Sequence, residues 1–421
     1  MQAKVLSFLK KESTAFIGVG LVVFTIVQIL ISTKALNDFW AGIIFWGAAI
    51  TILALGLNLI YGFNGQFSLG QYGFYAIGAY ASADITYRWN VKSDPSGIAV
   101  ALSGALLTLL CAIGIETFLR RFYRVSVMTR FVFQLLGTAL CFFVAVKVLA
   151  APLNALIWGV MAPLPPTISQ QIVFLFALVG GASIAGIVSY LFGIPILELG
   201  SDYFGISTLG FTIIVKVLLD NTDTILPFPE MKGARGMLGI PKWTTWPWIF
   251  FCLLAVVIIM RNLLHSSTGR AIVSVREDER AAELVGVDVA NAKLLAFVVG
   301  SVFAGLAGGL RAHDLAFLHP QSFNFIQSFN PLIVVVFGGL GSMTGTLFTG
   351  FAWIILLEGL LRDLPEGYET WRFVVYPLVL LLMMLLRPEG LLGKYELPFL
   401  RQNKPPVRKE YQEQVAEEVA R

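Results

Sequence analysis

The sequence predicts an all-α protein that crosses a membrane many times. Of its 421 residues, 57% are hydrophobic and only 13% carry a charge. Long apolar runs recur along the whole chain, and most are close to the roughly 20 residues that a membrane helix needs. Because a soluble protein of this length must cover its core with far more polar surface, these two observations exclude a soluble globular fold.

Apolar runs separated by polar, Pro or Gly residues predict about 10–12 transmembrane or partly spanning helices. Two of the runs, 202–219 and 325–340, are short, and we expect them to be re-entrant or broken. The other predicted spans lie at 15–33, 39–61, 66–87, 97–119, 131–150, 171–192, 246–264, 291–311, 344–361 and 372–387.

The placement of Lys and Arg predicts the orientation in the membrane. These residues gather near the N-terminus, in "RRFYR", in the loop 261–293 and after Arg387. Because positive charge is retained on the cytoplasmic side, both termini are predicted to be cytoplasmic. Residues 1–400 then form one transmembrane domain, and residues 401–421 form a charged cytoplasmic tail without an apolar stripe.

One segment does not fit a regular span. "AAPLNALIWGVMAPLPPTISQ", Ala150 to Gln170, has a short apolar centre and several prolines. We expect an outer loop that dips into the membrane interface.

The residues that usually carry chemistry form no recognisable site. Cys111, Cys141 and Cys252 lie in apolar runs, and the three histidines match no metal-ligand spacing, so no disulfide and no metal site is predicted. HExxH and GxSxG are absent, and "GLLGKYE" has the wrong spacing for a nucleotide-binding P-loop. We therefore expect a chain that is not an enzyme, binds no cofactor and has no nucleic-acid partner.

Charge is concentrated in the stretch "STGRAIVSVREDERAAELVGVDVANAKLLAF" between two apolar runs. Helix-forming residues predict a short helix from Arg276 to Val285, which Gly286 ends before Asp288 caps the next span. This helix, within the cytoplasmic segment 274–288, would turn its charged side to water, with Arg276, Asp278 and Arg280. It would turn Ala281, Ala282 and Val285 toward an apolar surface. Two interpretations are open: a docking helix for a partner, or a solvated loop.

A second set of residues is polar within or beside an apolar run. In "GFNGQFSLGQYG" these residues are Asn64, Gln66, Ser68 and Gln71, and Asn330 stands above the Gly-rich "GGLGSMTG". Polar groups at membrane depth must pair with one another, with backbone or with water. They either line a translocation path or form interhelical hydrogen bonds. The spans carry no charged pair suited to a proton relay, which disfavours a secondary transporter.

"REDERAAELVG" resembles the cytoplasmic loop of ABC importer permeases, in which E-A-A-x-x-x-G forms a coupling helix that docks into the ATPase subunit. Ala281, Ala282 and Gly286 match the pattern, whereas Arg280 stands where the leading Glu is expected and Glu279 lies one residue earlier. The residues to which this resemblance gives a coupling role are Arg276, Glu277, Asp278, Glu279, Arg280, Ala281, Ala282 and Gly286.

A narrower resemblance extends over nearly the whole chain. "LNLIYGFNGQFSLGQYGFYAIGAY", "SDYFGISTLGF", the loop motif above and "FNPLIVVVFGGLGSMTGTLFTG" occur in this order. Together they resemble the LivM-type permeases of branched-chain amino acid ABC importers. The main departure is the stretch 122–170, where a shorter connection is expected, and we interpret it as an added unit.

The resemblance implies a permease subunit in a bacterial inner membrane, surrounded by lipid. Its expected partners are a second, LivH-like permease, a periplasmic binding protein that delivers a branched-chain amino acid, and two cytoplasmic ATPase subunits that bind ATP and Mg. Urea or another small amide is the alternative substrate, because urea importers use similar permeases. A stand-alone channel or secondary transporter is the more distant alternative, for which a docking helix would have no use.

Overall fold

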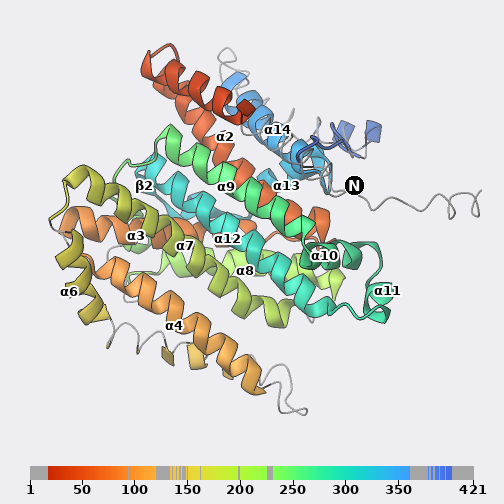
Figure 1. Cartoon of the computed structure of the whole chain (residues 1–421), viewed down its shortest axis with the longest axis horizontal. Helices are drawn as coiled ribbons and strands as arrows, with labels where there is room; N and C mark the ends of the chain where they lie inside the picture. The colour runs from red at the N-terminus through yellow and green to blue at the C-terminus, as the bar shows by residue number, and fades with distance from the viewer. Residues whose placement is uncertain are drawn as a thin grey trace, which may run out of the picture.

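The computed structural model describes residues 18–92, 94–119, 150–161, 163–197, 200–224 and 231–360, together with isolated positions in 133–148 and parts of 378–400. Within this part of the chain the structure is almost entirely helical (Figure 1). Its one strand pair, β1 (Met237–Leu238) with β2 (Phe317–Leu318), is short and antiparallel. The predicted all-α class is confirmed.

The helices fall into two groups by length. The long helices are α2 (Asp38–Leu57), α3 (Gln71–Lys92), α4 (Ser96–Leu119), α7 (Pro166–Leu197), α8 (Ser201–Asp220), α9 (Trp246–His265) and α12 (Val289–Leu315). The shorter helices are α6 (Ala150–Met161), α10 (Ser267–Glu277), α11 (Glu279–Leu284), α13 (Phe329–Gly338) and α14 (Met343–Ile354). Single turns or π-helical extensions are η1 (Asn58–Phe63), η4 (Gly233–Arg235), η5 (Pro320–Phe323), η6 (Phe325–Ser328) and η7 (Ile355–Leu360).

Five helices of the described residues are long and apolar enough to cross a membrane: Asp38–Phe63, Pro166–Leu197, Tyr203–Asp220, Trp246–His265 and Val289–Leu315. Shorter apolar helices include Gly18–Ser32 and Met343–Gly359. The chain is therefore a multi-pass membrane protein. The predicted runs 131–150 and 372–387 fall largely outside the described residues, so the total number of crossings stays a prediction.

Two predicted boundaries are wrong. The span expected from residue 66 begins only at Gln71, because the backbone leaves helical geometry at Gly65, whose φ is +81°. The segment expected as an outer loop at 150–170 is α6 followed directly by α7. Its prolines do not prevent helix formation, because Pro152 lies in the first turn of α6 and Pro166 begins α7, where proline's missing N–H costs nothing.

Of the two short runs expected to be re-entrant or broken, 202–219 is instead the continuous helix α8, because no proline or positive-φ glycine interrupts it, whereas 325–340 is broken. It consists of η6 and the ten-residue α13, and after residues 339–342 the chain continues as α14. A methyl group added to Gly345 would lie 1.9 Å from the carbonyl oxygen of Gly338, so the two short helices pack backbone to backbone at their joined ends. The ten residues of α13 are too few to cross a bilayer alone, whereas α14 continues without a break into η7.

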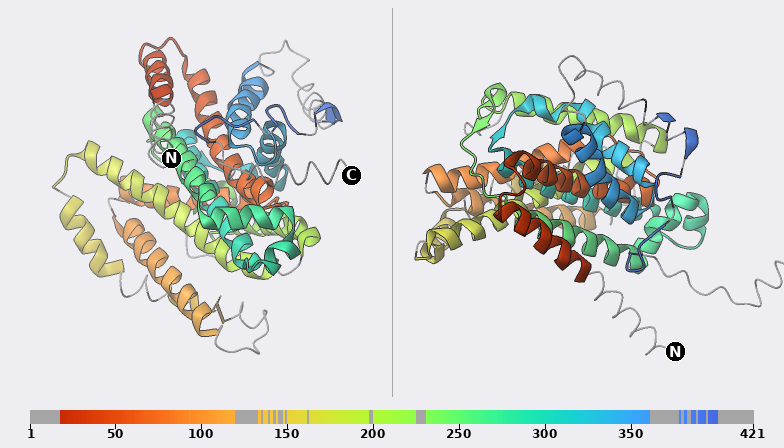
Figure 2. Two further views of the ribbon diagram at one scale, coloured as in Figure 1. Left: turned by 45° about the vertical axis from the view of Figure 1, so that its right-hand side comes forward. Right: turned by 90° about the horizontal axis from the view of Figure 1, so that it is seen from above.

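The core is a close packing of α2, α3 and α7 around α12, which runs through the middle of the molecule (Figures 1 and 2). Glycines allow this approach. A methyl group added to Gly78 of α3 would lie 2.2 Å from the carbonyl oxygen of Gly305 in α12, and one added to Gly181 of α7 would lie 2.6 Å from Gly78 O. Lipid is as apolar as the helix surfaces, so the hydrophobic effect does not drive membrane helices together. Small residues let the backbones approach closely, and van der Waals contacts then hold the helices together.

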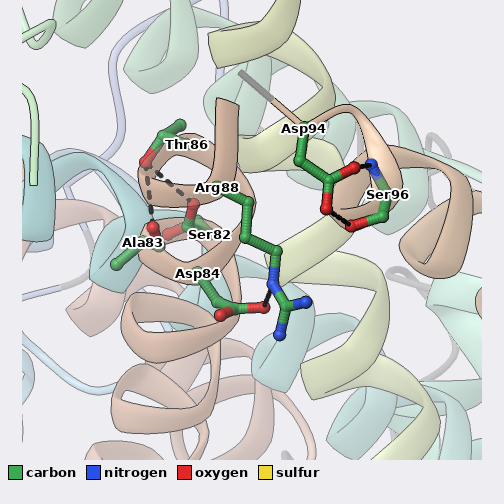
Figure 3. A network of polar contacts seen from close by, with 7 residues as sticks. All are labelled: Ser82, Ala83, Asp84, Thr86, Arg88, Asp94 and Ser96. Atoms are coloured by element: carbon green, nitrogen blue, oxygen red, sulfur yellow. Dashed lines mark hydrogen bonds and ion pairs between the residues drawn. The ribbon is translucent and has the colours of Figure 1, made fainter. Parts of the chain in front are cut away.

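α4 and α6 lie outside this core: α4 runs along α7, and α6 packs against α4 (Figure 2). The turn from α3 into α4 is fixed by Asp94, whose carboxylate accepts hydrogen bonds from the backbone N–H (2.9 Å) and hydroxyl (2.5 Å) of Ser96 (Figure 3). Partial burial raises the pKa of Asp94, but the hydrogen bonds from Ser96 outweigh it and leave that pKa below its usual value. Asp84 and Arg88, one turn apart on α3, form an ion pair at 2.9 Å beside this turn.

Replacing Gly305 with Leu should destabilise the protein strongly, because the new side chain must displace Ala185 Cβ, 2.6 Å from the added methyl position, and the backbone of Ala182. Overpacking of this kind costs about 1–3 kcal/mol or more. Thermal unfolding of the detergent-purified protein should show a clear fall in melting temperature. Gly210→Leu, where no heavy atom lies within 4 Å of the added position, is the matched control. Equal melting temperatures for both variants would contradict the packing described here.

Candidate functional site

The candidate site is built around a break between α2 and α3. α2 passes into the π-helical turn η1, Asn64 ends that turn, and residues 65–70 belong to no helix before α3 begins, although the N–H groups of Gly65 and Gln66 still donate to carbonyls of η1. Gly65 allows the change of direction through its positive φ. π-Helical turns and interrupted helices often mark functional positions, since the freed backbone groups need partners inside the protein.

The predicted polar residues Asn64, Gln66, Ser68 and Gln71 all lie in this break, and each is at most 5% exposed. The amide nitrogen of Asn64 donates to Gln66 Oε1 at 2.9 Å, and Ser68 Oγ accepts from the backbone N–H of Gly70 at 3.3 Å. The structure therefore brings together four of the five residues predicted for a path.

α8 holds the extended backbone of the break in place. The N–H of Leu69 donates to Thr208 Oγ1 at 3.0 Å, and the Thr212 hydroxyl donates to the carbonyl of Leu69 at 3.2 Å. Phe67 lies against Gly205 one turn earlier on α8, where an added methyl group would come within 2.7 Å of the ring. The threonine of "SDYFGISTLGF" thus forms a hydrogen bond with the backbone of the broken segment, and its first glycine leaves room for the Phe67 ring.

Some buried polar atoms in the break lack a partner. Neither the nitrogen nor the oxygen of the Gln71 side-chain amide has a hydrogen-bond partner among the described residues, and Asn64 Oδ1 has none either. A buried amide that stays unpaired costs about 1–3 kcal/mol, and a native structure seldom carries one without a reason. These atoms are the free donors and acceptors of the segment.

Asn58, which the sequence did not single out, joins this break to the α13–α14 hairpin. Its side chain is fully buried and makes three hydrogen bonds. The amide nitrogen donates to Ser342 O (2.9 Å) and Thr346 Oγ1 (2.8 Å), and the amide oxygen accepts from Gly341 N (2.9 Å). The only sequence signal was an asparagine inside the apolar run "ILALGLNLIYG".

Glu396 secures the other side of the hairpin. Its carboxylate accepts from the backbone N–H of Met343 at 2.6 Å and from the hydroxyl of Thr344 at 2.5 Å. These groups open α14, and a negative charge at a helix N-terminus is stabilised by the helix dipole. Nothing in the local sequence predicted this contact.

Asn330 does not join the cluster. It lies in the first turn of α13, and its amide donates to Gln327 Oε1 at 2.6 Å. The hairpin residues that contact Asn58 follow the other end of α13, about 12 Å further along at 1.5 Å per residue. The structure therefore separates Asn330 from the polar residues of the break.

The charged loop forms two helices instead of the single helix predicted from Arg276 to Val285. α10 extends to Glu277, and Asp278 then caps α11 by accepting from the N–H groups of Arg280 (2.9 Å) and Ala281 (3.0 Å). Aspartate competes poorly within a helix but well at its N-cap, which explains the break. Gly286, with φ +86°, and the cap at Asp288 fall where expected.

The two sides of α11 follow the prediction for Ala282 and Arg280, which are buried and exposed as expected, but the prediction is wrong for Val285. Ala282 is only 3% exposed and packs against the chain itself, whereas Leu284 and Val285 are 88% and 80% exposed. Glu279 forms an ion pair with Lys293 of α12 at 2.5 Å, which ties α11 to the core. Two large apolar side chains thus stand in the open beside the charged side chains of Arg280 and Glu283.

Arg276 is exposed, as expected, but it also has a contact that the sequence did not predict. Its guanidinium Nη1 donates to the carbonyl oxygen of Gly62 in η1 at 2.5 Å. The end of the molecule that carries α10 and α11 is therefore in direct contact with the helix break, and Figure 1 shows α10 beside the C-terminal end of α2.

Among the described residues, no group of three or more His, Cys, Asp or Glu side chains could hold a metal ion. What the fold and the site define is a multi-pass helical membrane protein with a buried, polar, interrupted helix and a short exposed helix at one end. These features are those of a membrane permease.

The chain belongs to the family described as the permease component of a branched-chain amino acid transport system, whose model matches residues 39–155 and 133–385. It is 32% identical over 247 residues to the high-affinity branched-chain amino acid transport permease LivM of Salmonella typhimurium, covering 50% of this chain and 56% of that protein. LivM of Escherichia coli K12 is 31% identical over 242 residues, covering 49% of this chain and 55% of that protein.

LivH of E. coli K12, a second permease of the same transport system by name, is 27% identical over 206 residues, covering 46% of this chain and 64% of that protein. The chain thus spans little more than half the length of the curated relatives it matches. The resemblance to LivM-type permeases drawn from the motifs is confirmed. No solved structure matches the chain.

Replacing Asn58 with Leu should lower stability, because the buried N–H of Gly341 then loses its acceptor and Ser342 O loses a donor. The cost is about 1–3 kcal/mol for each buried group left unpaired. The fall should appear in the melting temperature in detergent. Asn262→Leu, at an exposed position of α9, should leave that temperature nearly unchanged; a similar fall in both variants would argue against a special role for Asn58.

Proposed function

We propose that this chain is the permease subunit of an ATP-driven importer that moves branched-chain amino acids into the cytoplasm. The observation that carries the proposal is the family match over most of the chain, together with similarity to both LivM and LivH, whose names assign them to branched-chain amino acid transport. The chain itself takes no catalytic part, and ATP and Mg are bound by partner subunits.

The proposed assembly has this chain beside a LivH-like permease, two cytoplasmic ATPases and a periplasmic binding protein. The similarity of one chain to both LivM and LivH favours two homologous permeases packed around a shared path. Because Lys and Arg are concentrated on the side of the charged loop, that end faces the cytoplasm, with both termini, in a bacterial inner membrane.

In this assembly α11 is the helix that docks on an ATPase. Leu284 and Val285 offer two exposed apolar side chains, which association would remove from water, and the surrounding charges of both signs would fix the orientation of the partner. The role predicted for Ala282 changes accordingly, since it supports α11 from beneath instead of touching the ATPase.

The break between α2 and α3 is the proposed wall of the path. A zwitterionic amino acid entering a membrane must exchange water for protein donors and acceptors. The unpaired amide of Gln71 and the free Oδ1 of Asn64 can supply such groups, and small neighbouring residues leave the lining weakly polar. Tight binding is not needed here, because the binding protein selects the substrate.

The direct test is purification of the tagged chain in mild detergent from its own membranes, followed by mass spectrometry and uptake of radiolabelled leucine and urea. We expect a second permease and two ATPases to co-purify, and leucine uptake to be lost when the gene is deleted. The double variant Leu284→Asp/Val285→Asp should retain the second permease but lose most of the ATPase, because charges now occupy the docking surface.

Leu238→Asp is the matched control, since Leu238 is also exposed but lies in β1 at the far end of α12. It should keep the ATPase at the wild-type level. A chain recovered alone that transports without ATP would overturn the importer assignment. Loss of urea uptake instead of leucine uptake would overturn the substrate.

Replacing Gln71 with Leu separates a transport role from a structural one. Removing an unpaired buried amide should leave the melting temperature equal or higher, because a desolvation penalty disappears. Uptake should fall by about 10-fold or more, because a hydrogen bond to a charged substrate group contributes about 1.5–3 kcal/mol. The measurement pairs thermal unfolding with initial uptake rates in proteoliposomes.

The control is Gln321→Leu, at an exposed position of η5, which should change neither quantity. Lower stability with unchanged uptake for Gln71→Leu would show that Gln71 serves the fold.

A further inference from the structure

Arg276 occupies an unusual position between the charged loop and the helix break. It lies in the last turn of α10, two residues before Asp278, which caps α11. Its guanidinium reaches Gly62 of η1, a residue 214 positions earlier in the sequence, with a hydrogen bond of 2.5 Å. One side chain therefore connects the exposed helix to the buried segment that contains Asn64 and Gln71.

Glycines from two other segments make room for this side chain. A methyl group added to Gly65 would lie 3.4 Å from Arg276 Cγ, and one added to Gly341 would lie 2.6 Å from Arg276 Nη1. Both glycines have positive φ, +81° and +80°. The Arg276 side chain thus lies against the backbone of Gly65 in the break. It also reaches Gly341 of the hairpin loop, whose N–H donates to Asn58.

The contact is also favourable electrostatically. Gly62 lies in the last turn of the continuous helix α2–η1, where carbonyl groups lack intrahelical partners and the helix dipole is negative. A guanidinium retains its charge at any physiological pH, and a charged donor makes a stronger hydrogen bond than a neutral one. Arg276 therefore caps the helix end from which the break departs.

An ion pair also connects α11 to a different part of the molecule. Glu279 pairs with Lys293, which belongs to α12 in the tightly packed core. That ion pair fixes α11 to the part of the molecule held by close glycine contacts, whereas Arg276 leads to the segment whose backbone is interrupted. The two contacts therefore connect the α10–α11 segment to two different parts of the molecule.

We propose that Arg276 is a positioning residue that transmits movement of α11 to the segment Gly62–Gln71, so that an event at the docking surface opens or closes the polar path. This role rests on the function proposed above. Arg276 does not contact the ATPase in this scheme; it acts through Gly62 O and the backbone it caps.

The experiment compares wild type, Arg276→Gln, Arg276→Lys and the control Arg270→Gln in the full complex, reconstituted in proteoliposomes with its binding protein. Arg270 lies on the same helix, is exposed, and donates only to His265 O at the start of α10 among the contacts described. Two rates are measured for each variant: ATP hydrolysis stimulated by the loaded binding protein, and uptake of radiolabelled leucine.

We expect Arg276→Gln to hydrolyse ATP within about 2-fold of wild type but to take up leucine at least 10-fold more slowly. Arg276→Lys should recover part of the uptake, because it restores the charge but not the reach and geometry of the guanidinium. Arg270→Gln should match wild type in both rates. A merely structural role would lower hydrolysis and uptake together and leave their ratio unchanged.

A second measurement follows the break itself. Phe67 is 38% exposed within the segment, so Phe67→Cys in a background lacking the native cysteines reports its accessibility to a maleimide. With Arg276 present, the labelling rate should differ between the nucleotide-free and the vanadate-trapped complex; with Arg276→Gln that difference should vanish. An unchanged nucleotide dependence together with unchanged uptake would overturn the relay, whereas wild-type complex that shows no ATP-dependent uptake would overturn the proposed function instead.

Discussion

The structure depends on one requirement, which is that a backbone leaving helical geometry inside a membrane must find other hydrogen-bond partners. In the part of the chain that the structure describes, such interruptions lie between α2 and α3 and between α13 and α14. Asn58 links the two places, because its side chain at the start of η1 bonds to the backbone of the hairpin loop. Thr208 and Thr212 serve the first interruption, and Glu396 serves the second.

A rigid part and an adjustable part follow from this arrangement. Around α12, helices approach so closely that glycine is the only residue that fits at several contacts, and such packing resists deformation. The interrupted segments are held instead by individual hydrogen bonds from side chains of other helices. Bonds of this type can be exchanged one at a time, so the interrupted segments can rearrange while the core keeps its shape.

The sequence predicted those features that depend on local pattern. Apolar runs located the long helices, and polar residues among glycines located the broken segment. Gly286 and Asp288 marked the end of one helix and the start of the next. The sequence could not predict Asn58 or Glu396, because the partner of Asn58 lies 284 residues away and a carboxylate near a distant helix end has no periodic signature.

The loop around Asp278 shows a different limit. Helix propensity favoured one continuous helix through Arg276, but the side chain of Asp278 ended it by capping the next one. The sequence also failed to predict the exposure of Val285. It was expected beside Ala282 on the apolar side, but Ala282 packs against the chain while Val285 does not.

The cap supplied by Glu396 also bears on how the protein is made. Translation proceeds from the N-terminus, so α13 and α14 leave the ribosome before residue 396 does. Until Glu396 has been synthesised, its carboxylate cannot accept the hydrogen bond from the N–H of Met343 at the start of α14. The hydrogen bonds that complete the second interruption can therefore form only after the helices of the core have been synthesised.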